Sequence, residues 1–275
     1  MKLCALFLSI VLMCGIICGC KDKKDNQDIN STVSSVTSVA SEVTAMAGDT
    51  ILDPQGGENG RPMGETVNIS DVAPKNGVHN GIDVSKWQGK IVWSKVKDAG
   101  IDFAVIRIGF RGENGKIYKD EYADYNIQQA SRNGVLVGVY FFSTAVNTNE
   151  AAEEAEWVKE NIKYYPVSLP VVYDCEGFHN SGSRMYNLSN KQRTDNALSF
   201  IEKIKSLGYD AMFYASKNDL ETAFETERIE AKSKIWVAHF DGKIYPEAKN
   251  PQYSGKYTMW QYTNKGIVNG VSGDV

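Results

Sequence analysis

From Val78 onward, short apolar runs alternate with longer amphipathic segments, and this alternation constrains the fold more than any other feature of the chain. Alternating strand and helix signals predict parallel strands joined by crossover helices. We expect strands at 81–84, 103–109, 136–142, 171–176, 211–215, 235–240 and 258–262, with an eighth that begins near Val271. We expect helices at 91–99, 120–132, 149–164, 191–207 and 217–228.

The helix signals end with the segment 217–228, whereas the strand signals continue toward the C-terminus. This order gives about five βα units followed by three strands, and it favours an irregular TIM-like α/β barrel over a doubly wound open sheet. Catalytic side chains of such barrels lie at the C-terminal ends of the strands. Asp83, Asp174 and Glu176 all fall at such ends.

Asp174 and Glu176 stand two residues apart at the end of the apolar run 169–172. On a strand, residues at this spacing project from the same face, roughly 6 to 7 Å apart. Two carboxyls in different surroundings can divide their roles, with one protonated as a general acid while the other stays ionised. A solvated strand end would show the same short pattern, so the pair alone does not establish a glycosidase.

Two longer motifs surround these acids. Residues 81–89 read Gly-Ile-Asp-Val-Ser-Lys-Trp-Gln-Gly, and residues 170–177 read Pro-Val-Val-Tyr-Asp-Cys-Glu-Gly. With the segments 138–142, 213–216, 236–240 and 259–262, they resemble glycoside hydrolase family 25 lysozymes in the order of that family and cover essentially all of 80–275. The resemblance implies an irregular barrel and hydrolysis of the β-1,4 bond between N-acetylmuramic acid and N-acetylglucosamine in peptidoglycan.

The resemblance and the chemistry together assign roles to the acids. Glu176 is expected to be the general acid that protonates the glycosidic oxygen. Asp174 is expected to be the second carboxylate, which either stabilises the oxocarbenium-like charge or positions the 2-acetamido group of the substrate. Asp83 would bind sugar hydroxyls or tune the pair, although a capping role is the alternative. Core packing competes with sugar binding for the strand aromatics, and the expected substrate-binding residues are Tyr140, Tyr214, Trp236, Trp260 and Gln261.

Two further strand residues invite a prediction. Arg107 lies inside an apolar strand, where an unpaired charge would be costly, and Asp83 is one carboxylate that could pair with it. Phe141 stands where the family often has His, and by strand alternation it faces away from Tyr140. We therefore expect Phe141 to pack in the core.

The mature domain contains one cysteine, Cys175, which by alternation points away from the two acids. We interpret it as a small packing residue, because a thiol nucleophile also needs a positioned histidine. Neither a metal nor another cofactor is expected, since the three histidines lack ligand spacing. They are His79, His179 and His239.

The N-terminus has the pattern of a secretion signal at 1–19, with Lys2 as the basic flank of an apolar stretch. The tetrapeptide Ile-Cys-Gly-Cys at 17–20 resembles the bacterial lipobox and implies lipidation of Cys20; an ordinary signal peptide is the alternative. The polar segment 20–77 has almost no aromatic residues and predicts a disordered tether. A secreted lipoprotein on the outer face of the bacterial cell membrane is expected.

The net charge of −4 and the absence of a basic block argue against nucleic acid as a partner. The expected partners are peptidoglycan strands and, through the lipid, the membrane, and the protein is expected to be a monomer. Residues 78–275 form the expected catalytic barrel. Family members usually continue into a further Asp, so a final strand truncated at Val275 is expected.

Two alternatives stay open for the barrel. A chitinase-like enzyme would also place acids at a strand end, but it normally carries a longer run of alternating acids, whereas Val172 occupies the position two before Asp174. The second alternative is a surface lipoprotein that keeps the sugar-binding groove of such a barrel but binds wall glycan without hydrolysing it. Only the intact acid pair argues against this second alternative.

Overall fold

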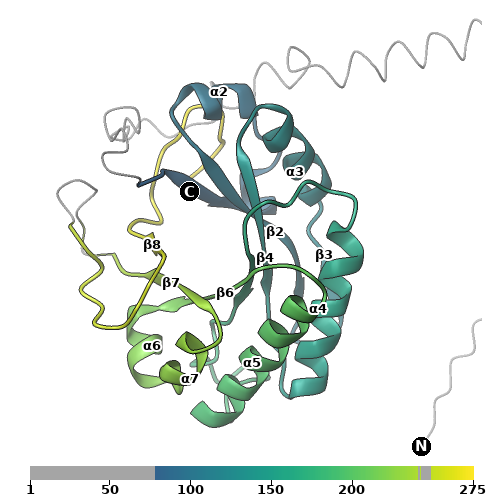
Figure 1. Cartoon of the computed structure of the whole chain (residues 1–275), viewed down its shortest axis with the longest axis vertical. Helices are drawn as coiled ribbons and strands as arrows, with labels where there is room; N and C mark the ends of the chain where they lie inside the picture. The colour runs from purple at the N-terminus through teal and green to yellow at the C-terminus, as the bar shows by residue number, and fades with distance from the viewer. Residues whose placement is uncertain (1–77, 241, 243–248) are drawn as a thin grey trace, which may run out of the picture. The chain divides into compact units, whose positions relative to one another are not determined.

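The structure, a computed structural model, describes residues 78–240, 242 and 249–275 (Figure 1). The predicted signal and tether at 1–77 lie outside this range. Within it, none of the helices is long and apolar enough to cross a membrane.

In the described residues, eight strands form one sheet. Seven of them run parallel in the order β1-β2-β4-β5-β6-β7-β8, and β3 pairs antiparallel with β2. The strands are β1 Gly81–Val84, β2 Phe103–Arg111, β3 Ile117–Lys119, β4 Leu136–Phe142, β5 Val171–Asp174, β6 Ala211–Ser216, β7 Lys234–Ala238 and β8 Met259–Gln261. The helices are η3 Lys86–Gln88, α2 Trp93–Asp98, α3 Ala123–Arg132, α4 Thr148–Ile162, α5 Asn190–Ser206, α6 Lys217–Thr222 and α7 Thr226–Glu230.

The parallel sheet curls into a half-barrel, and α3, α4 and α5 cover its outer face (Figure 1). Side-chain alternation divides the apolar residues between two cores. Phe141 belongs to the outer core under the helices, whereas Tyr140 packs against the inner cluster of Val105, Val172 and Met212. The predicted packing role of Phe141 is therefore confirmed.

The long helices begin at side-chain caps and bury one apolar stripe each. Asn147 accepts a hydrogen bond from the backbone N–H of Glu150 at the start of α4, and Ser189 forms a capping box with Gln192 at the start of α5. The buried apolar residues recur at helical spacing. In α4 and α5 they are Ala151, Ala155, Val158, Ile162, Ala197, Phe200, Ile201 and Ile204.

The C-terminal part departs from the prediction. The described residues contain no strand near Val271, so the prediction of an eighth strand there was wrong. Gly270 and Gly273 have φ values of 93° and 88°, and these left-handed turns interrupt an extended backbone. Gly266 and Val275 instead exchange two backbone hydrogen bonds, 2.8 and 2.9 Å long.

Two smaller differences concern β3 and the segment 217–228. The hairpin strand β3 was not predicted, because a three-residue strand has too few residues to show a period. The single helix predicted for 217–228 is divided into α6 and α7.

Candidate active site

Six strands contribute to one small cavity inside the half-barrel, which we call the acid cavity. Its volume is about 110 Å³, and its walls are Asp83, Tyr140, Asp174, Glu176, Tyr214, Trp236 and Gln261. Asp174 is registered with Tyr214 across β5 and β6, and Tyr214 with Trp236 across β6 and β7. Residues in register on neighbouring parallel strands project their side chains from the same face of the sheet, which explains why these side chains meet.

The acid pair lies at the end of β5. Asp174 is the last residue of the strand and is only 5% exposed, whereas Glu176 follows it in the loop and is half-buried. The strand was expected to extend to Glu176. Gly177, with a φ of 76°, allows the sharp turn that directs the chain away after the second acid.

Burial raises the pKa of both acids. For Asp174 burial is the largest cause, and the nearby negative charges of Glu176 and Asp83 raise the pKa further, while Arg107 lowers it. For Glu176 burial is again the largest cause, and its interaction with Asp174 partly offsets the rise in pKa. The two carboxyls interact strongly enough to titrate as a pair, in which one proton can be shared between them.

Asp83 is tied into the cavity wall by Gln261. The amide Nε2 of Gln261 donates a 2.8 Å hydrogen bond to Asp83 Oδ2, and the Tyr214 hydroxyl donates one of 2.8 Å to Gln261 Oε1. Burial raises the pKa of Asp83, and the Gln261 hydrogen bond partly offsets this rise. The relay joins β6, β8 and β1, and β8 and β1 are the two ends of the parallel sheet.

Two polar atoms of the cavity residues have no hydrogen-bond partner in the described part of the chain. They are Asp174 Oδ1 and Trp236 Nε1, and both are buried. Buried polar atoms are normally satisfied, so an unpaired acceptor and an unpaired donor in a cavity wall are available to a ligand. Tyr140 adds a neutral hydroxyl, because burial holds its pKa well above the ordinary value.

Arg107 pairs with Asp120 and not with Asp83, so that pairing was predicted wrongly. Its Nε and one terminal nitrogen each lie 2.8 Å from Asp120 Oδ2. The register of β2 shifts between Arg107 and Gly109, and the hairpin through β3 brings Asp120 back to the strand. Arg107 required a carboxylate, but the sequence alone gave no signal that Asp120 would supply it.

Trp260 lies outside the acid cavity. Gln261, the next residue of β8, faces the acid cavity, so by alternation Trp260 faces the outer core. Its indole N–H donates a 3.1 Å hydrogen bond to the backbone oxygen of His239. Cys175 also belongs to the outer core, where its Sγ lies 3.9 Å from the sulfur of Met185. Burial raises the pKa of the Cys175 thiol well above its usual value, so the thiol is neutral and inert.

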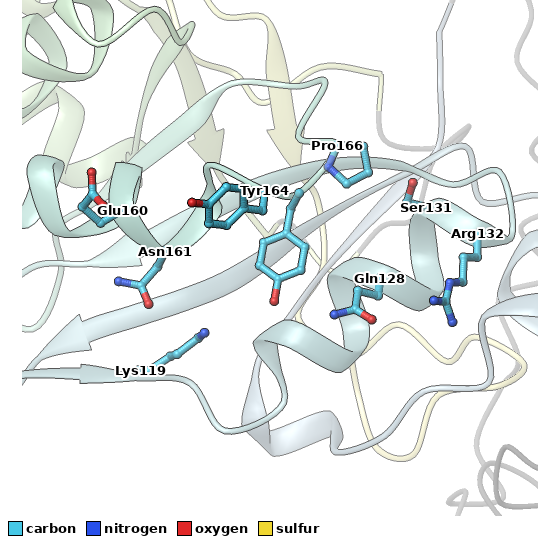
Figure 2. Close-up of a pocket in the computed structure, with 9 residues that line it drawn as sticks. Lys119, Gln128, Ser131, Arg132, Glu160, Asn161, Tyr164 and Pro166 are labelled. Atoms are coloured by element: carbon cyan, nitrogen blue, oxygen red, sulfur yellow. The ribbon is translucent and has the colours of Figure 1, made fainter. Parts of the chain in front are cut away.

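A second groove, of about 550 Å³, lies between α3 and α4 on the outside of the half-barrel (Figure 2). It is lined by Lys119, Gln128, Ser131, Arg132, Glu160, Asn161, Tyr164, Tyr165 and Pro166. None of these residues lines the acid cavity. Lys119 is paired with Asp124 and Glu160 with Lys163, so these charges are engaged within the protein. Among the residues that the structure describes, no group of three metal-ligating side chains occurs.

A curled parallel sheet with a pair of buried acids at a strand end is the arrangement expected of an α/β glycosidase. The chain belongs to the glycosyl hydrolases family 25, whose sequence profile matches residues 82–271. Lysozyme M1 of Streptomyces globisporus is 35% identical over 228 residues, which cover 79% of this chain and 72% of that protein. The resemblance to family 25 is thus confirmed, and the protein is a glycoside hydrolase.

Solved structures agree with this assignment. A bacterial lysozyme from Streptomyces coelicolor matches with a TM-score of 0.57 and 32% identity, over 73% of this chain and 91% of that one. The modular autolysin LytC from Streptococcus pneumoniae, solved with a synthetic peptidoglycan ligand, matches with a TM-score of 0.61 and 24% identity. The match covers 74% of this chain but only 46% of LytC, so this chain shares the fold of about half of that larger protein.

Proposed function

We propose that the protein is a lysozyme that hydrolyses the β-1,4 bond between N-acetylmuramic acid and N-acetylglucosamine in peptidoglycan. One observation carries the proposal: Asp174 and Glu176 share a buried cavity with raised pKa values, and its wall holds an acceptor and a donor that no described residue pairs with. An N-acetylated sugar offers the matching N–H and oxygen groups. The lysozymes among the relatives support the same substrate.

In the proposed mechanism, Asp174 Oδ1 accepts the N–H of the 2-acetamido group and directs its carbonyl oxygen toward C1. That oxygen forms a bond to C1 while the glycosidic bond breaks, and Glu176 donates its proton to the departing oxygen. Water then attacks C1, the bond between C1 and the acetamido oxygen breaks to restore the acetamido group, and the water gives a proton to Glu176, which restores the acid. The hydrogen bond from the sugar also favours the ionised form of Asp174, so that the shared proton moves to Glu176 when substrate binds.

The remaining cavity groups hold the sugar. The Trp236 indole N–H and the neutral Tyr140 hydroxyl supply donors for sugar oxygens, and the aromatic rings of Tyr214 and Trp236 supply apolar surface. Asp83, held by Gln261, keeps negative charge near the oxocarbenium-like transition state. For residues 78–275 we propose the irregular TIM-like barrel of the family, with five βα units followed by β7 and β8.

The products identify the enzyme. Purified peptidoglycan digested with the protein should release muropeptides whose new reducing ends are N-acetylmuramic acid, as measured by borohydride reduction and mass spectrometry. New ends of N-acetylglucosamine would mean that the other β-1,4 bond is cut, as in a chitinase-like enzyme. Binding to the wall without any new reducing end would indicate that the protein binds glycan without hydrolysing it.

For the N-terminal part we propose a lipid anchor at Cys20, with 20–77 as the tether and a monomeric enzyme on the outer face of the cell membrane. The pattern at 17–20 and the polar composition after it support this proposal. Stable anchoring takes about two acyl chains, so a diacylated cysteine is expected. Membrane fractionation of Cys20→Ala tests it: the variant should leave the membrane fraction or persist as precursor, and unchanged retention and gel mobility would refute the anchor.

A further inference from the structure

Another groove, of about 550 Å³, begins where β1 ends, and we call it the Trp87 groove. It is lined by Lys86, Trp87 and Lys90 from η3 and the turn after it, and by Glu121 and Tyr122 from the segment before α3. No residue of this groove lines the acid cavity, yet Asp83 stands only four positions before Trp87 in the sequence.

Trp87 is 76% exposed, although a large apolar side chain is normally buried. The turn that carries it is held in place on both sides. Ser85 and Gln88 form a capping box, and Gln88 Nε2 donates a 2.7 Å hydrogen bond to the backbone oxygen of Asp274. The N–H of Lys86 donates to the Asp120 carboxylate, which also binds Arg107. The indole is therefore an exposed platform on a fixed support.

The charge of the groove favours an anion. The ammonium of Lys86 lies 4.8 Å from the Trp87 ring centroid, and that of Lys90 lies 5.6 Å from the Tyr125 ring centroid. Neither lysine forms an ion pair with a carboxylate in the part of the chain that the structure describes. Glu121 contributes the opposing charge, so two cations face one anion. A neutral sugar would make no use of this excess.

The groove is also within reach of the catalytic cavity. Four residues span at most about 14 Å, which is on the scale of a sugar ring with a branch attached to it. We propose that the Trp87 groove binds the peptide stem carried by the muramic acid in the cavity. Carboxylates of the stem pair with Lys86 and Lys90, and its apolar side chains pack on the Trp87 indole. This inference rests on the proposed function and names a second recognition element of the same substrate.

Two substrates distinguish recognition of the peptide stem from recognition of the glycan. One is intact peptidoglycan stripped of phosphodiester polymers, and the other is the same material after an amidase has removed its peptides. The double variant Lys86→Gln with Lys90→Gln should lose about fivefold to tenfold in kcat/KM on the intact substrate, as expected for two exposed charge contacts. On the peptide-free glycan, variant and wild type should agree within about twofold. Trp87→Ala should show the same selectivity.

The control carries the same change of charge at the other end of the strands. Lys232→Gln with Lys234→Gln removes two exposed ion pairs at the start of β7 and should leave both rates unchanged. Equal losses on both substrates would show that the groove binds sugar, and no loss on either would show that it binds nothing; both results overturn the inference. A third substrate, wall that retains its phosphodiester polymers, completes the test, because a loss on that material alone would assign the groove to phosphate and also overturn the inference.

A binding measurement keeps the inference testable apart from catalysis. A free tetrapeptide stem is titrated into the Glu176→Gln variant, and the indole N–H of Trp87 is followed by nuclear magnetic resonance. The signal of Trp87 should shift with saturation, and the added pair Lys86→Gln and Lys90→Gln should weaken binding about fivefold or more. If the wild type cleaves neither substrate, the proposed function fails, and this titration alone decides whether the groove takes the peptide. No shift of Trp87 would overturn it.

Discussion

Buried carboxyls lie on both faces of the sheet at β5, Glu154 in a polar group on the outer face and the acid pair on the inner face, and they differ in how fully their oxygens are satisfied. On the outer face, Glu154 receives a 2.6 Å hydrogen bond from Arg111 Nε at one oxygen and one of 2.6 Å from Ser143 Oγ at the other. On the inner face, Asp174 Oδ1 has no partner in the described residues. We call the outer group, Arg111, Ser143, Glu154 and Tyr173, the Arg111 cluster.

Burial raises the pKa of carboxyls in both groups, so the direction of the shift does not separate them. The pKa of Glu154 rises to about 7, chiefly through burial, although the hydrogen bonds from Ser143 and Arg111 lower it in part. The geometry separates the groups. In the Arg111 cluster both oxygens of Glu154 have partners, the Ser143 and Tyr173 hydroxyls lie 3.0 Å apart, and Ser143 N–H donates a 2.8 Å hydrogen bond to the backbone oxygen of Asp174. A raised pKa marks a catalytic acid only where a ligand can reach unsatisfied atoms.

The largest expected effect is on Glu176→Gln. Glutamine keeps the shape of the side chain but has no proton to donate, so peptidoglycan hydrolysis should fall on the order of a hundredfold or more. The melting temperature should not decrease, because the change removes a charge from a crowded cavity. Release of muropeptides and a thermal melt measure the two quantities. Full activity in this variant would exclude Glu176 as the general acid.

Asp174→Asn should be almost as damaging to turnover, because the group that orients the acetamido N–H loses its charge. The unfolding free energy of this variant, in contrast, should be higher than that of the wild type at pH values above the folded pKa of Asp174. The folded state raises the pKa of Asp174, so its contribution to stability is complete below the unfolded pKa and is lost as pH increases through the folded pKa. The variant should therefore flatten the decrease of unfolding free energy with rising pH, measured by urea denaturation. An unchanged pH dependence would contradict the inferred burial cost.

Arg111→Leu tests the other half of the comparison. It leaves Glu154 buried without its cation, and the unfolding free energy should fall by about 3 kcal/mol at neutral pH. Specific activity per folded molecule should stay within about threefold, because the cluster does not line the acid cavity. Denaturation curves and active-site-normalised rates measure these outcomes. A loss of activity as large as that of Asp174→Asn would make the Arg111 cluster part of the catalytic machinery.

The smallest expected effect is a shift of the pH profile by Asp83→Asn. The negative charge of Asp83 raises the pKa of both acids of the pair. Its removal should lower these pKa values, so the alkaline limb of kcat/KM, where the shared proton is lost, should move to lower pH by about half to one unit. Gln261→Glu, which adds charge beside Asp83, should move the limb to higher pH. Shifts of the same sign in both variants would contradict this electrostatic explanation.

The sequence predicted most of the strands and the long helices, because side-chain period and capping residues are local properties. β1 and β4 have the bounds that were predicted, and Phe141 and Tyr140 face opposite sides as alternation requires. The roles of Glu176 and Asp174 stay predictions that the proposed experiments test. Trp260 shows the limit of the same reasoning, since an aromatic residue next to the site residue Gln261 lies on the other face.

By itself, the sequence determined the alternation of strands and helices, the acid pair at one strand end and the motifs of family 25. Only the tertiary structure decided which distant side chains meet. Gln261 donates a hydrogen bond to Asp83 across 178 positions, Arg107 pairs with Asp120 through an unpredicted hairpin, and the Trp236 indole N–H has no partner among the residues that the structure describes. The physical reason is that period and capping act within a few residues, whereas the partners of buried polar atoms are set by curling of the whole sheet.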